Sequence, residues 1–189
     1  RIMPIKMNGR TVTIAMTVSD QIATKTVRQT ITVCELLPAQ IMVTRTIANS
    51  GHIYITNGGS ATRIPGNVAV TVEPGVTIVL DKPSGGLEVN GQLIAVGTPT
   101  QKIKFVGNSC GSEDGLYSGI YFQLDEAEGT LRYCDVSGGK DGVTARDGGA
   151  VTLRNCQVFG HTDFGVSSQS GASVSVIECN VWENGEGIF

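Results

Sequence analysis

Two aspartates and a histidine have the types and spacing that could support bond cleavage. Asp141 and Asp163 stand one repeat apart, and His161 lies just before Asp163. Glycoside-cleaving sites use two carboxyl groups, one of them as a proton donor, and histidine exchanges a proton near neutral pH. Asp141, Asp163 and His161 are therefore the candidate catalytic residues. The other interpretation, which we favour, is that they are solvated residues of surface loops.

A second set of side chains could bind a metal ion or a sugar. Asp141 and Asp147 offer two carboxylates, but Ca²⁺ takes about six to eight oxygen ligands. The sequence has no GGxGxD-type repeat, so we expect no metal and no other cofactor. Tyr117, Tyr121 and Trp182 are the candidate carbohydrate-binding residues, because aromatic rings combine an apolar face with a polar edge. Single exposed aromatic residues are also ordinary on protein surfaces.

Three of the five cysteines recur at a fixed interval. The five are Cys34, Cys110, Cys134, Cys156 and Cys179. The last three could form a metal or redox ladder, but their spacing matches no zinc pattern such as CxxC. Residues stacked on parallel strands lie ~4.8 Å apart, which exceeds the ~3.8 Å Cβ separation of a disulfide. We therefore expect an inert row of buried thiols, and we leave open whether Cys34 and Cys110 pair with each other or with another chain.

The interval of the cysteines belongs to a repeat of 22 to 23 residues. Leucine or valine precedes each repeating cysteine by three residues, and valine follows it by two. A glycine followed by a β-branched residue recurs with the same period. These pairs are Gly119-Ile120, Gly142-Val143, Gly165-Val166 and Gly187-Ile188. Because two independent columns share one period, the sequence predicts a repeat fold.

Each repeat predicts short strands separated by bends. Val151 and Leu153 alternate with polar residues, Cys156 and Val158 do the same, and the phase slips at Asn155. Asparagine tolerates the left-handed backbone that a sharp bend requires. A third strand begins at Val166. Three strands and three bends predict one coil of a triangular solenoid, in which neighbouring coils complete the core of each coil.

Residues 66–189 resemble the right-handed parallel β-helices of the pectin-lyase-like superfamily. The resemblance is carried by residues 74–80, 86–98, 102–105 and 119–122. It implies an all-β fold with three strands per coil, in a secreted or cell-surface protein of a bacterium or archaeon. The segment 161–163 is similar to the histidine motif of pectin-degrading hydrolases. However, the paired aspartates, the Gly-His-Gly and the Arg-x-Lys of those enzymes are missing, and the calcium-binding aspartates and catalytic arginine of the lyases have no counterpart.

The first 36 residues do not follow the repeat. Apolar residues alternate with polar ones over 12–18 and again over 27–33, with a turn at 19–21. This pattern predicts a β-hairpin, and it resembles the end of an immunoglobulin-like sandwich. An isolated hairpin is marginally stable, so its partners must come from elsewhere. We therefore divide the chain into a hairpin at 1–36, either the end of a sandwich or an assembly strand pair, and a parallel β-helix at 37–189.

The composition of the chain limits the classes of binding partner that we expect. The net charge is -3 and charged residues make up 16% of the chain, so nucleic acid is not an expected partner, and no apolar run is long enough to span a membrane. Both ends begin or stop inside strand patterns, which favours a partial chain or end-to-end association with further copies. Other copies, joined at the ends or through the hairpin, and surface glycans are the candidate partners.

We therefore expect a non-catalytic extracellular structural or adhesion module that can assemble into a fibre or filament. The alternatives are a polysaccharide lyase or glycoside hydrolase, and a carbohydrate-binding module without cleavage.

Overall fold

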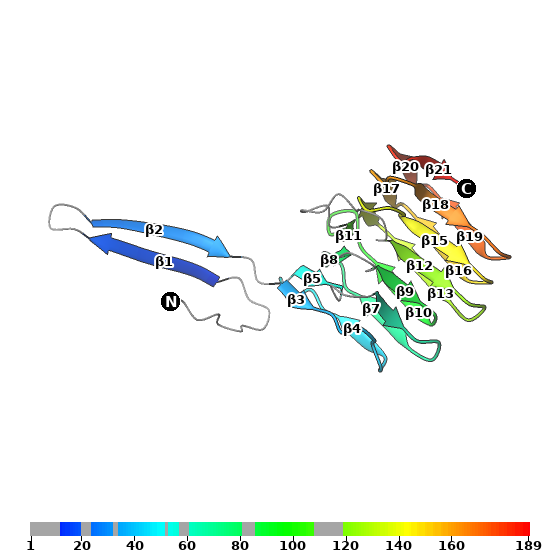
Figure 1. Cartoon of the computed structure of the whole chain (residues 1–189), viewed down its shortest axis with the longest axis horizontal. Helices are drawn as coiled ribbons and strands as arrows, with labels where there is room; N and C mark the ends of the chain where they lie inside the picture. Colours follow the sequence, from blue (N-terminus) through cyan, green and yellow to red (C-terminus); the bar gives the residue numbers. More distant parts are fainter. Residues whose placement is uncertain are drawn as a thin grey trace.

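Three parallel sheets wind into a solenoid of stacked coils (Figure 1). The computed structural model describes residues 12–19, 24–31, 34–51, 53–56, 61–80, 86–107 and 119–189, and the two ranges before residue 34 by backbone alone. Sheet 1 contains β4 (Arg45–Ile47), β7 (Ala69–Val72), β10 (Gln92–Val96), β13 (Glu128–Arg132), β16 (Ala150–Arg154) and β19 (Ser173–Ile177). Sheet 2 contains β3 (Cys34–Leu36), β5 (Ile53–Ile55), β8 (Thr77–Leu80), β11 (Ile103–Gly107), β14 (Cys134–Ser137), β17 (Gln157–Phe159) and β20 (Asn180–Trp182). Sheet 3 contains β6 (Thr62–Ile64), β9 (Leu87–Val89), β12 (Ile120–Gln123), β15 (Val143–Arg146), β18 (Phe164–Ser168) and β21 (Glu186–Ile188).

The chain visits sheets 1, 2 and 3 in turn, so β4–β5–β6 form coil 1 and β19–β20–β21 form coil 6. We name the corners between the sheets the 1–2, 2–3 and 3–1 corners. At the 1–2 corner of coils 4 to 6, the residue directly after the sheet 1 strand bends the chain, and the strands are separated by one residue in coil 4 and by two in coils 5 and 6. Tyr133, Asn155 and Glu178 hold this place with φ values of 49°, 53° and 54°. The predicted left-handed bend is confirmed, and a tyrosine and a glutamate adopt it as well as the asparagine.

Like residues lie over like residues along the axis. Gln157 pairs with Asp135 on one side and with Asn180 on the other, which places Cys134, Cys156 and Cys179 in one file. Leu131 and Leu153 are also register partners. The single file of cysteines on which the repeat interpretation depends is therefore confirmed.

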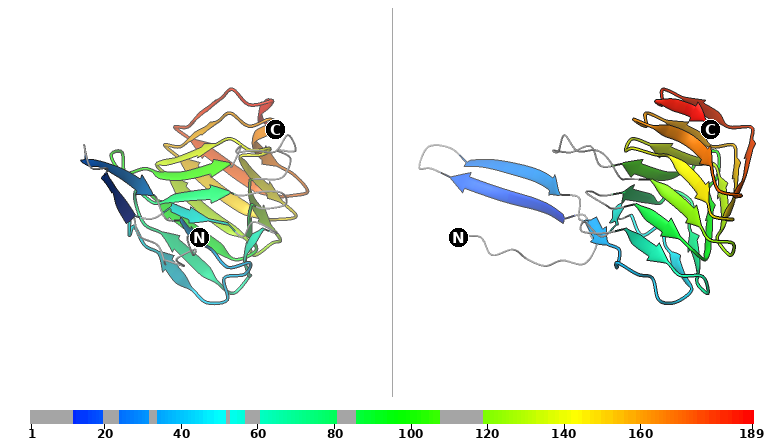
Figure 2. Two further views of the ribbon diagram at one scale, coloured as in Figure 1. Left: turned by 60° about the vertical axis from the view of Figure 1, so that its left-hand side comes forward. Right: turned by 45° about the vertical axis from the view of Figure 1, so that its right-hand side comes forward.

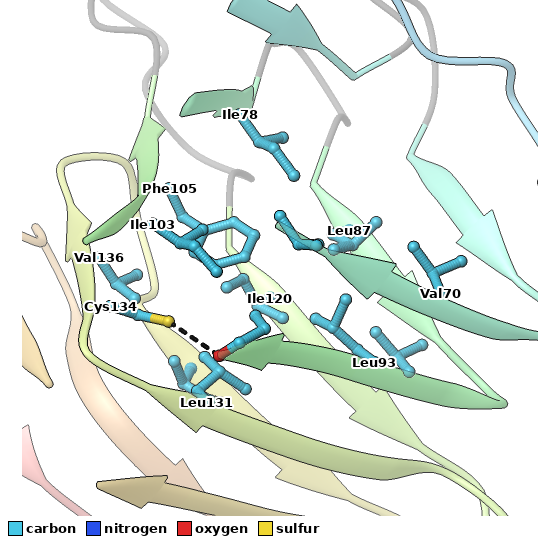
Figure 3. Close-up of a cluster of buried hydrophobic side chains, with 14 of the residues drawn as sticks. Val70, Ile78, Leu87, Leu93, Ile103, Phe105, Ile120, Leu131, Cys134 and Val136 are labelled. Carbon is cyan, nitrogen blue, oxygen red and sulfur yellow. Dashed lines mark hydrogen bonds between the residues drawn. The ribbon is translucent and has the colours of Figure 1, made fainter. Parts of the chain in front are cut away.

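The core is a narrow apolar column between the three sheets (Figure 3). The inward pairs of β9, β10 and β11 are all buried, as the alternation predicts. They are Leu87 and Val89, Leu93 and Ala95, and Ile103 and Phe105. Gly129 occupies an inward position of β13 where a Cβ would lie 2.4–2.6 Å from the Phe122 ring and Val151. The missing side chain at Gly129 makes room for the ring of Phe122.

The glycine column of the repeat lies at the start of each sheet 3 strand. A Cβ on Gly86 would lie 2.5 Å from the carbonyl oxygen of Gly119, and a Cβ on Gly165 would lie 2.8 Å from that of Gly187. The glycines of this column before the last coil therefore face the backbone of the next coil along the axis, whereas Gly187 in coil 6 has nothing within 4 Å of a Cβ. Close approach between coils explains why this marker repeats with the same period as the cysteines.

β1 (Val12–Ser19) and β2 (Thr24–Ile31) pair antiparallel as a separate two-stranded sheet, which confirms the hairpin (Figure 2). β3 pairs with β5 in sheet 2, so solenoid pairing begins at Cys34, three residues before the boundary placed at 37. The sequence of 106–118, rich in glycine and acidic residues, also predicts a loop, but Val106 and Gly107 complete β11. The remainder of that loop lies outside the described residues.

Candidate functional site

The candidate catalytic residues lie at the 2–3 corner, between β14 and β15 and between β17 and β18. Tyr121, on the outer face of β12, lies beside them. We call Tyr121, Lys140, Asp141, His161 and Asp163 the corner cluster. Short connections of glycine and polar residues bring these side chains from coils 3, 4 and 5 to one edge of sheet 3.

Tyr121 and Asp141 form a hydrogen bond between coils 3 and 4. The Tyr121 hydroxyl donates to Asp141 Oδ2 at 3.0 Å. Burial, and then the charge of Asp141, raise the pKa of Tyr121 well above its ordinary value. The tyrosine is therefore a neutral donor at physiological pH. Asp141 Oδ1 is buried without a hydrogen-bond partner, so this carboxylate depends on the Tyr121 hydroxyl.

Asp163 has a different partner. Its Oδ2 lies 3.6 Å from Lys140 Nζ, and its backbone N–H donates to the Lys140 carbonyl at 2.9 Å. The register of the coils therefore stacks Asp163 over Lys140. The two candidate carboxylates gather at one edge, but each is paired with a side chain of another type.

His161 is turned into the corner and is only 3% exposed. Its Nε2 lies 3.3 Å from the Val136 carbonyl oxygen, and its backbone N–H donates to Asn184 Oδ1 at 3.1 Å. Nδ1 is buried without a partner. Burial lowers the pKa of the imidazole, so His161 is neutral at pH 7 and has little access to a substrate.

Three residues that matter at this edge were not found from the sequence. Asn184 accepts from His161 and donates from Nδ2 to the Val158 carbonyl at 3.2 Å. Ser167 donates to Thr144 at 3.0 Å, and both hydroxyls are buried on the outer side of sheet 3. The signal was available in the register, because Thr144 and Ser167 are direct partners on β15 and β18.

The candidate metal ligands are not brought together. Asp141 precedes β15 and Asp147 follows it, so the whole strand separates them. Within the described parts of the chain, no group of three or more histidine, cysteine, aspartate or glutamate side chains is placed to hold a metal ion.

Of the candidate sugar-binding residues, Tyr117 lies outside the described residues. Tyr121 faces outward, but it is partly buried and its hydroxyl is engaged by Asp141. Trp182 is 37% exposed and stacks on Phe159, with 4.5 Å between ring centroids and 10° between ring planes. One face of the indole is therefore covered by the preceding coil.

The cysteine file consists of thiols that donate to the backbone. Cys134 Sγ donates to the Ala95 carbonyl at 3.3 Å, the bond drawn in Figure 3, and Cys156 Sγ donates to that of Leu131 at 3.4 Å. The hydrogen bond with Cys156 and burial raise the pKa of the Cys134 thiol. Burial raises the pKa of Cys179 as well. Cys34 is exposed in β3, and Cys110 lies outside the described residues, so their pairing with each other or with another chain stays open.

One comparison with known proteins gave a match. The family described as "Right handed beta helix region" matches residues 46–189, well over half of the chain. The search of curated proteins and the search of solved structures returned no significant match. Among the residues that the structure describes, no helix is long and apolar enough to cross a membrane. The match and the stacked three-sheet coils agree, and the chain belongs to the family of right-handed β-helix regions.

Proposed function

We propose that this β-helix is a non-catalytic structural or adhesion module of an extracellular or cell-surface protein. The observation that carries the proposal is the engagement of the corner cluster. Each candidate catalytic side chain holds a contact with another coil: Asp141 with coil 3, and Asp163 and His161 with coil 4. The polar residues of this edge therefore act as ties between successive coils.

The free energies of these contacts support a structural role. A buried hydrogen bond stabilises a fold by about 1 kcal/mol, whereas an unpaired buried acceptor costs about 1–3 kcal/mol. An acid–base pair needs carboxyl groups that reach the substrate with pKa values set apart. At this edge one carboxylate depends on a tyrosine and the other faces a lysine. These contacts favour cohesion of the solenoid over proton transfer.

An assay on a panel of polysaccharides tests the proposal. Reducing ends report hydrolysis, and the absorbance of unsaturated products reports lyase activity. We expect no product above the blank, and we expect Asp141→Asn and Asp163→Asn to lower the melting temperature. Product formed by the wild type and lost in either variant at unchanged melting temperature would identify a lyase or hydrolase instead.

Association through coil 6 is a second part of the proposal. Within the described residues, β19, β20 and β21 have sheet neighbours on one side only. Several inward side chains of this coil are only partly buried: Ala172, Val174, Val176, Cys179 and Val181. Strand edges and apolar side chains of this kind pair with further strands, either of adjoining chain or of another copy. Sedimentation velocity over a range of concentrations, with electron microscopy of the same samples, separates these sources, because only pairing between copies gives concentration-dependent rods.

The location outside the cell is supported by the resemblance to bacterial surface β-helices. Labelling of intact source cells with an antibody to this domain tests it. Signal that arises only after permeabilisation would contradict an extracellular location.

A further inference from the structure

A notch interrupts the 3–1 corner where one coil is short. Between register-equivalent residues of sheets 3 and 1, coil 2 has only Asn90 and Gly91. The corresponding stretches are residues 65–68 in coil 1, 123–127 in coil 3, 146–149 in coil 4 and 169–172 in coil 5. The short turn of coil 2 therefore lies behind the turns of coils 1 and 3, and a hollow opens between them.

The hollow has a volume of about 450 Å³ and a mixed lining. Coil 1 contributes Pro65 and Gly66, coil 3 contributes Leu124, Asp125 and Glu126, and the recessed turn of coil 2 contributes Asn90. Gln40 and Arg63 lie at the sheet 3 side of the rim. A volume of this size lies within the range of small-molecule sites, about 300–1,000 Å³.

The charged side chains at the hollow are the ion-paired Arg63 and the carboxylates of Asp125 and Glu126. Arg63 is the cationic side chain of the lining. The Glu126 carboxylate reaches across the hollow, since its Oε2 would lie 3.0 Å from a Cβ on Gly66. Asp125 is directed away, because a Cβ built on Gly148 in coil 4 would overlap Asp125 Oδ1. The Arg63 guanidinium is already paired with Glu88, to whose Oε2 it donates at 2.6 and 2.8 Å, so the Glu126 carboxylate and the amides of Gln40 and Asn90 are the polar groups directed at the space.

An unsatisfied acceptor lies within this lining. Asn90 Oδ1 is buried and has no hydrogen-bond partner, although the Asn90 backbone N–H donates to the Ile64 carbonyl at 2.8 Å. A buried acceptor without a donor is unfavourable unless a bound group supplies the hydrogen. Beside it, Pro65 and Leu124 offer an apolar surface, and Leu124 is 53% exposed at the rim.

We propose that the notch binds one residue of a neutral, hydroxyl-rich sugar. Hydroxyl groups both donate and accept, so a single sugar ring can donate to Asn90 Oδ1 and Glu126 and accept from Gln40. Pro65 and Leu124 cover an apolar face of the ring. An anionic ligand is repelled by the Glu126 carboxylate, and an ammonium group has no acceptor for the Gln40 amide. This site is separate from the corner cluster, and the inference does not depend on the scaffold proposal.

Binding to the whole chain is measured by saturation-transfer NMR and titration calorimetry. The probes are glucose, galactose, mannose and N-acetylglucosamine, with galacturonic acid and glucosamine as charged comparisons. Gly66→Leu fills the notch at an exposed position whose backbone is not left-handed, and Asn90→Leu removes the buried acceptor. Asp147→Asn changes the same corner one coil beyond the notch and is the matched control.

We expect at least one neutral sugar to bind, and both notch variants to lower its affinity about tenfold or more. Asp147→Asn keeps the wild-type affinity. The proposal is overturned if no neutral sugar binds at about 10 mM, if Gly66→Leu binds as well as the wild type, or if only the charged probes bind. Because Gly66→Leu alters only an exposed glycine, it decides the matter even if Asn90→Leu does not fold.

Discussion

The 1–2 corner of coils 4 to 6 keeps the same bend in each coil, whereas the turn at the 3–1 corner varies in length from coil to coil. At the first, one residue with a left-handed backbone makes the bend after the sheet 1 strand in each coil, whether it is tyrosine, asparagine or glutamate. At the second, the connection between equivalent residues ranges from Asn90 and Gly91 in coil 2 to residues 123–127 in coil 3. The uniform corner maintains the phase of the inward side chains. The variable corner changes length without disturbing the core, and the notch arises there.

The largest expected effect comes from the core that both corners surround. Phe122→Ala removes a fully buried ring packed beside Gly129. We expect a loss of about 3–5 kcal/mol in the free energy of unfolding, measured by urea denaturation. A matched loss at an outward position, Gln123→Ala, is expected to cost well under half as much. Equal losses in the two variants would mean that Phe122 is not part of a continuous core.

The next largest effect on stability is expected at the 1–2 corner of coils 4 to 6, the uniform corner. Asn155→Val places a β-branched residue at a φ of 53°, and we expect a destabilisation of about 1–3 kcal/mol. Asn155→Gly tolerates the same backbone and serves as the control, with a much smaller change. If valine is tolerated as well as glycine in thermal unfolding, the bend does not require a left-handed residue.

The 2–3 corner gives a somewhat smaller effect. Tyr121→Phe removes the hydroxyl that donates to Asp141 and leaves a partly buried carboxylate without its tyrosine partner. We expect a loss of about 1–2 kcal/mol. The double variant Tyr121→Phe with Asp141→Asn should recover part of that loss, because the uncompensated charge is gone. Additive losses in this double-mutant cycle would show that the two side chains do not interact.

Lowering the pH is expected to have a smaller effect on stability, through His161 at the same 2–3 corner. Burial holds the pKa of folded His161 below its ordinary value, so below about pH 6.5 the unfolded chain binds a proton more readily than the folded chain. The stability contributed by neutral His161 is complete above that pH and is lost as pH falls through the folded pKa. Denaturation at about pH 7.5 and about pH 5.5 should show a smaller pH dependence for His161→Gln than for the wild type. An unchanged dependence would place His161 in water.

The smallest expected effect lies on the rim of the notch. Arg63 donates to Glu88 Oε2 at 2.6 and 2.8 Å, but its side chain is 53% exposed. Exposed ion pairs contribute little, so Arg63→Gln should change stability by less than about 1 kcal/mol. A loss as large as that of Asn155→Val would mean that the variable corner carries as much of the fold as the uniform one.

The sequence predicted the features that depend on period and missed those that depend on side-chain direction. The cysteine file, the glycine column and the bend at Asn155 follow from spacing alone, because each coil repeats the same path. The bond between Tyr121 and Asp141 joins residues whose motifs look unrelated, and the burial of His161 depends on how its connection turns. The notch at Asn90 is a difference in turn length, which is visible only after the registers of sheets 1 and 3 are known.

Methyl NOE spectroscopy of valine-labelled protein tests the stacking of coils most directly. Val158 is the register partner of Val136 in one neighbouring coil and of Val181 in the other. With coils ~4.8 Å apart, we predict strong cross-peaks from Val158 to both valines and none directly between Val136 and Val181. A missing cross-peak between Val136 and Val158, or a strong one between Val136 and Val181, would contradict the single-file arrangement.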